Sequence, residues 1–91
     1  MQNNQEQIRI LRSEIDVIHA EMIGLFRRRL NLVKKIWVIK KNINSPMLDS
    51  AREETIIHQF DSSVTDTKEK TSVQNFLKFI LDESKSYMEN L

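Results

Sequence analysis

The sequence of 91 residues contains no cysteine, one glycine and one proline. Without cysteine, disulfide bonds and thiolate chemistry are excluded. One glycine cannot build a glycine-rich phosphate-binding loop. So few turn-forming residues also disfavour a sheet protein with many tight turns, and long helices are therefore expected.

The chain also lacks an excess of charge, because 14 Lys and Arg face 13 Asp and Glu for a net charge of +1. This balance disfavours binding to nucleic acid or to an anionic membrane, but it is compatible with a local cationic pocket. No apolar run approaches the roughly 20 residues of a membrane-spanning helix, and the polar start does not resemble a signal peptide. We expect a cytoplasmic protein that contacts neither nucleic acid nor membrane.

Apolar residues recur at alternating steps of three and four positions in the first half of the chain. This spacing predicts one long helix over about residues 5–43. The members of this apolar series are Ile8, Leu11, Ile15, Ile18, Met22, Leu25, Leu32, Ile36, Ile39 and Ile43. Such a helix is roughly 58 Å long, whereas a compact domain of this size is about 30 Å across. One chain has too little material to cover it, so we predict self-association.

Pro46 ends the predicted long helix, because proline removes a donor and disfavours helical geometry at the residue before it. A second, short helix is expected at about 50–61. Its start is either a capping box of Ser50 with Glu53 or an N-cap at Asp49.

A polar stretch over 61–70 predicts a loop before a third helix. This helix is expected at about 72–90, opened by a capping box of Thr71 with Gln74. The predicted fold class is therefore all-α, with three helices in a single domain, 1–91.

Two polar residues interrupt the apolar pattern of the helices. Arg29 breaks the series of the long helix, and Ser84 breaks that of the third. A buried arginine is costly unless an anion or a carboxylate faces it. The breaks indicate either an anion-binding pocket or an internal polar contact that fixes helix register.

Arg12 and Lys40 share one side of the long helix but lie roughly 42 Å apart by the helix rise. They cannot serve one small ligand within a single chain. In an antiparallel dimer, Arg12 of one chain approaches Arg29 and Lys40 of the other. Each is also explained as a solvated surface charge. His19 and His58 lack metal-ligand spacing on a common helix face, so no metal site is expected.

Three segments resemble the all-helical (type II) chorismate mutases, and the resemblance runs from about residue 8 to 88. The family's opening Leu-Arg and Ile-Asp pattern is similar to LRSEID at 11–16. Its Arg-rich segment followed by a lysine is similar to RRRLNLVKKIWVIK at 27–40. Its Pro-x-x-Asp-x-x-Arg-Glu signature is similar to PMLDSAREE at 46–54, the most specific match.

The resemblance implies an intertwined helical homodimer that converts chorismate to prephenate in aromatic amino-acid biosynthesis. By the same resemblance, Arg12 reaches into the partner protomer's pocket to hold a substrate carboxylate. Arg29 clamps a carboxylate within its own chain, and Lys40 bonds the ether oxygen and a carboxylate. Ser84 lies near a substrate carboxylate.

The resemblance further implies that Glu53 holds the substrate hydroxyl and that Asp49 and Arg52 line and order the pocket mouth. The rearrangement is pericyclic, so it requires no nucleophile, proton shuttle or cofactor. The protein has to fold a flexible dianion into a reactive conformer and stabilise charge growing on the ether oxygen. Fixed arginines and a lysine are suited to both tasks.

Met88 departs from the family, which places Gln or Glu there against the ether oxygen. A thioether donates no hydrogen bond, so Lys40 would stabilise this oxygen alone unless Glu89 substitutes through a shifted helix register. Losing one such donor typically costs roughly 10²–10³ in rate.

Two other interpretations stay open. Some relatives are isochorismate pyruvate lyases, although their match to the Pro-x-x-Asp-x-x-Arg-Glu segment is poorer. Alternatively, the chain is a non-catalytic helical dimer that binds a metabolite or a partner protein, the interpretation that Met88 favours. Some weak members of the family need an activating partner enzyme, and the sequence does not decide whether this chain does.

Overall fold

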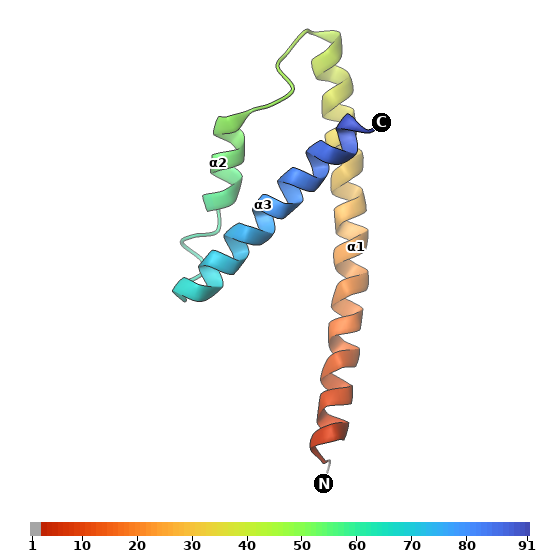
Figure 1. Cartoon of the computed structure of the whole chain (residues 1–91), viewed down its shortest axis with the longest axis vertical. Coiled ribbons are helices and arrows are strands. Elements are labelled where there is room, and N and C mark those ends of the chain that lie inside the picture. Colours follow the sequence, from red (N-terminus) through yellow and green to blue (C-terminus); the bar gives the residue numbers. More distant parts are fainter. Residues whose placement is uncertain (1–2) are drawn as a thin grey trace. The chain divides into compact units, whose positions relative to one another are not determined.

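The computed structural model describes residues 3–91 (Figure 1). Over these residues its secondary structure consists of α1 (Asn4–Asn42), α2 (Ser50–His58) and α3 (Thr67–Glu89). No strand is formed in the described part of the chain, so the predicted all-α class is confirmed.

Backbone contacts divide the chain into two units, Met1–Val33 and Lys34–Leu91. The first unit holds most of α1, while the second holds its last turns together with α2 and α3. Within the second unit, α2 packs against α3.

α1 is 39 residues long and has no buried residue. At its start, the side-chain oxygen of Asn3 accepts a hydrogen bond from the Glu6 backbone N–H at 2.7 Å, as an N-cap does. The predicted apolar series keeps between 42% and 67% of its surface exposed. Its members are Ile8, Leu11, Ile15, Ile18, Met22, Leu25, Leu32, Ile36, Ile39 and Ile43. The apolar face of α1 is therefore about half exposed along its length.

Asn44 ends α1, two residues before Pro46. Its φ of 54° is left-handed, a conformation that Asn tolerates better than most residues. Ser45 N donates to Lys40 O at 2.9 Å, and Asn44 N donates to Lys41 O at 3.4 Å. These are the two bonds of a Schellman motif, so local backbone bonds stop the helix before the proline is reached.

α2 begins behind Asp49, whose Oδ1 accepts from Arg52 N at 2.9 Å. Asp49 is thus the cap of this helix, and the alternative capping box with Ser50 at its head was wrong. The helix ends at His58, three residues before the predicted end at 61.

α3 begins at Thr67, earlier than predicted, because Asp66 caps it: Asp66 Oδ1 accepts from Glu69 N at 2.8 Å. The predicted start at 72, with Thr71 as the cap, was wrong, and so was the predicted loop over its last four residues, 67–70. These residues are polar, but Lys and Glu are good helix formers.

The buried positions of the described chain all lie on one face of α3. They are Leu81, Ser84 and Met88, at the spacing of a single helix face. Two of the three are apolar, which is a very small core for a chain of this length.

The start of α3 can be tested with two alanine variants. We expect Asp66→Ala to lower the free energy of unfolding by about 1 kcal/mol, because it removes the acceptor for Glu69 N. Thr71→Ala is the control and should cost nothing, since Thr71 lies inside the helix, where alanine is the better helix former. Urea unfolding at one protein concentration measures both. A larger loss for Thr71→Ala would contradict the cap at Asp66.

Candidate functional site

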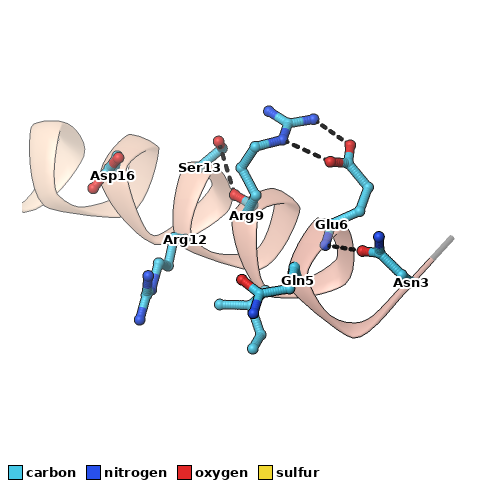
Figure 2. Close-up of a pocket in the computed structure, with 8 residues that line it drawn as sticks. Asn3, Gln5, Glu6, Arg9, Arg12, Ser13 and Asp16 are labelled. Carbon is cyan, nitrogen blue, oxygen red and sulfur yellow. Dashed lines mark hydrogen bonds and ion pairs between the residues drawn. The ribbon is translucent and has the colours of Figure 1, made fainter.

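Arg12 is exposed on the first unit, beside an open hollow on α1 (Figure 2). The hollow is lined by Asn3, Gln5, Glu6, Ile8, Arg9, Arg12, Ser13 and Asp16. These residues come from the start of the chain, nearly all from one helix, and the surface of one helix cannot enclose a ligand. The hollow is not a binding pocket by itself.

The two arginines of this hollow differ in their contacts. Arg9 is paired with Glu6, with Nη2 at 2.5 Å from Oε1 and Nε at 3.1 Å from Oε2. This pairing raises the pKa of Arg9 and lowers that of Glu6. Arg12 extends to the other side of the helix, and no interaction is drawn from it to the residues in Figure 2. Arg12 is thus available to a group outside its own helix.

Arg29 is partly buried near the end of the first unit. It lies 17 positions after Arg12 on the same helix, which corresponds to about 26 Å of helix rise. The structure therefore does not bring these two arginines together within one chain.

Lys40 lies in the last turns of α1, which belong to the second unit, and is partly buried. Its Nζ donates to the Met47 carbonyl oxygen at 3.4 Å, a long hydrogen bond to the segment before α2. The Schellman motif at Asn44 fixes the backbone of this turn, so the position of Lys40 depends on how the helix ends.

Asp49, Arg52 and Glu53 are brought together in and beside the first turn of α2. The Asp49 carboxylate is occupied as the N-cap, and Glu53 N donates to Asp49 O at 3.0 Å. Arg52 is exposed, whereas Glu53 is partly buried. Asp49 therefore acts on this turn by fixing its backbone.

Glu53 is joined to α3 through Lys85, a residue that the sequence reasoning missed. Lys85 Nζ lies 2.8 Å from Glu53 Oε1, and the two side chains are 32% and 29% exposed. The hydrogen bond that Lys85 donates to the Glu53 carboxylate is the main cause that raises the pKa of Lys85. The available signal was the position of Lys85, which follows Ser84 and precedes Met88 by one helical turn.

Ser84 and Met88 lie one turn apart on the buried face of α3, and each is only 5% exposed. Ser84 Oγ donates to Ile80 O at 2.7 Å. Glu89, the alternative acid, is exposed and is the last residue of α3. At this end of the helix the inward side chain is therefore the thioether and not the carboxylate.

A second polar link between α2 and α3 is formed around Asp61. Gln74 Nε2 donates to Asp61 Oδ1 at 2.9 Å, and His58 Nδ1 lies 2.8 Å from Asp61 Oδ2. The hydrogen bond from Gln74, followed by that from His58, lowers the pKa of Asp61. Together with the Glu53–Lys85 pair, this link determines how the first turn of α2 is presented beside α3.

A metal centre has no support in the described residues, which contain no group of three His, Cys, Asp or Glu side chains able to hold an ion. No helix of the described chain is long and apolar enough to cross a membrane.

A sequence model of the family described as chorismate mutase type II matches residues 11–89. Because this match covers most of the chain, the protein belongs to that family. Neither the search of curated proteins nor the search of solved structures finds a match.

The Asp61 link predicts a dependence of stability on pH. The pKa of Asp61 is lowered from its ordinary value of 3.8. The ionised carboxylate therefore contributes to the free energy of unfolding at pH values above 3.8. This contribution is lost as the pH falls through the lower pKa of the folded state. We therefore expect the urea midpoint to fall as the pH drops below about 4.

The variant Gln74→Leu removes the hydrogen bond that is the largest cause of the lowered Asp61 pKa. The urea midpoint of this variant should therefore change less with pH than that of the wild type. The control is Asn75→Leu, which alters an exposed amide next to it on α3. If both variants keep the wild-type pH dependence, Asp61 does not link the helices in this way.

Proposed function

We propose that the protein is a chorismate mutase, which rearranges chorismate to prephenate in pockets formed by two copies of the chain. The observation that carries this proposal is the family match, because residues 11–89 include every candidate site residue. The biosynthesis of aromatic amino acids in the cytoplasm is the corresponding cellular role.

The exposed apolar face of α1 supports a homodimer. From Ile8 to Leu25 this face is about half exposed at every step of the series. Burial of apolar surface is worth about 25 cal/mol per Å², so a helix of this length gains most by packing against another long helix. An identical α1 offers a self-complementary seam, as two-fold symmetric interfaces require.

The dimer gives Arg12 a role that one chain does not. Its guanidinium is exposed and lies about 26 Å along the helix from Arg29. In an antiparallel pair, Arg12 enters the partner's pocket and holds one substrate carboxylate, while Arg29 of that partner holds the other. Two planar guanidinium groups at a fixed separation favour the folded conformer of the dianion.

Lys40 and Glu53 act on the remaining oxygens of the substrate. Lys40 places a compact positive charge at the ether oxygen, where negative charge grows as the bond breaks. Glu53 accepts the hydrogen bond of the ring hydroxyl and so fixes the ring. Arg52 orders the pocket mouth, Asp49 holds the turn that carries these residues, and Ser84 lies near a carboxylate.

The experiment that tests this function is the loss of chorismate absorbance after addition of the purified protein, with the product identified. Conversion to prephenate supports the proposal. A different product, or no conversion and no binding of chorismate by the folded protein, would rule it out.

Met88 favours a second candidate function, a non-catalytic dimer that binds chorismate or a similar dicarboxylate. Its thioether is 5% exposed on the inward face of α3 and donates no hydrogen bond. A folded protein that binds chorismate without converting it supports this alternative. If a partner enzyme then restores conversion, the protein is a partner-activated mutase.

The Met88→Gln variant distinguishes the two functions. An amide at this inward position supplies a donor to the ether oxygen, so we expect kcat/KM for chorismate to rise about tenfold or more. Glu89→Ala is the matched control and should leave the rate unchanged, because Glu89 is exposed. A loss on Glu89→Ala together with no gain on Met88→Gln would assign the ether-oxygen contact to Glu89.

Mixing two inactive variants tests the shared pocket. Arg12→Ala and Arg29→Ala should each lower activity strongly when assayed alone. In a mixed dimer, one pocket carries both defects and the other carries neither, so an equal mixture after subunit exchange should recover about 25% of wild-type activity. Arg12→Ala mixed with an equal amount of wild-type protein serves as the dilution control and should keep about half of the wild-type activity with or without exchange. No recovery, or a monomeric mass by light scattering at micromolar concentration, would contradict the dimer.

A further inference from the structure

We propose that Lys85 is a positioning residue that holds the Glu53 carboxylate for the substrate hydroxyl, an inference that rests on the proposed function. The ion pair joins the first turn of α2 to the turn of α3 that contains Ser84 and Met88. Among the described residues, no other ion pair joins α2 to α3.

The geometry leaves one oxygen of Glu53 for the substrate. Lys85 Nζ is 2.8 Å from Oε1. Within residues 3–91, Oε2 is engaged in no hydrogen bond or ion pair. A carboxylate held at one oxygen loses its freedom to rotate, while its second oxygen still accepts a hydrogen bond. Lys85 therefore restricts the rotation of the Glu53 carboxylate and leaves Oε2 available to the substrate.

The backbone of Glu53 is restrained as well. Its N–H donates to Asp49 O at 3.0 Å in the capped first turn of α2. Asp49 thus fixes the main chain and Lys85 fixes the end of the side chain. Precise placement of a binding group requires such support, because errors of about 1 Å in position are costly for a bound substrate.

The charge of Lys85 gives a second reason for this role. Chorismate is a dianion, and a lone Glu53 carboxylate facing it adds like-charge repulsion. Lys85 compensates this charge, and it stays protonated because Glu53, with smaller contributions from Asp82 and Glu89, raises its pKa. The pair offers a hydrogen-bond acceptor with little net charge.

An ordinary surface ion pair is the competing explanation, since many such pairs contribute little to stability. The two side chains are about one-third exposed, so neither is deeply buried. The explanations differ in what they predict for the substrate. A surface ion pair affects only the stability of the folded protein. A positioning pair affects KM for the substrate, and it does so entirely through Glu53.

The test is a double-mutant cycle measured by steady-state conversion of chorismate. We expect Lys85→Met to raise KM about tenfold with less than about a threefold change in kcat. In the Glu53→Gln background, the same change should have no further effect, because Lys85 then has no carboxylate to hold. Lys78→Met is the matched control: it removes one exposed positive charge from α3 and should change KM less than about twofold.

Each outcome decides a different point. Effects of Lys85→Met and Glu53→Gln that multiply would show that Lys85 acts independently of Glu53 and would overturn the inference. A wild-type KM, or a gain in activity from relief of a blocked Glu53, would also overturn it while leaving the mutase function in place. If Lys85→Met does not fold, Lys85→Gln is carried through the same cycle. A wild-type protein that neither converts nor binds chorismate removes both proposals together.

Discussion

The long apolar face of α1 is the constraint on which the rest of this protein depends. Its residues recur at helical spacing, yet they remain largely exposed in a single chain. Only Leu81 and Met88 are buried apolar residues in the described chain. Such a core is very small for a chain of this length, and the proposed dimer would add burial along this face.

In the proposed dimer, the partner chain would contribute both to the core and to the site. In the first unit, Arg12 and Arg29 are too far apart along one helix to meet at one ligand. The same packing that covers the apolar face of an antiparallel pair reduces this separation between chains. Under this arrangement, stability and ligand binding depend on one interface. Substitutions in the apolar face of α1 would therefore affect both.

The regular parts of the fold were predictable because they depend on local pattern. The helical period of the apolar residues predicts α1, and the sequence offers Asp49 as one of two possible caps for α2. The start of α3 is earlier than predicted because the polar residues 67–70 also suit a loop, whereas Asp66 with Glu69 three residues later is itself a cap. The backbone bonds around Asn44 stop α1 before Pro46, although proline is the stronger signal in the sequence.

The candidate site was predictable only where it interrupts a pattern or matches a motif. Ser84 breaks an apolar stripe and is indeed buried at 5% exposure. Lys85 breaks no pattern, since a lysine beside a buried face is ordinary in an amphipathic helix, and only the packing of α2 on α3 brings it to Glu53. The same packing turns Met88 inward and leaves Glu89 in solvent. The inward side chain at this end of α3 donates no hydrogen bond, while the Lys85 ammonium places a positive charge at the Glu53 carboxylate. The departure from the family's pattern at Met88 and the ion pair of Lys85 with Glu53 therefore lie within one turn of α3.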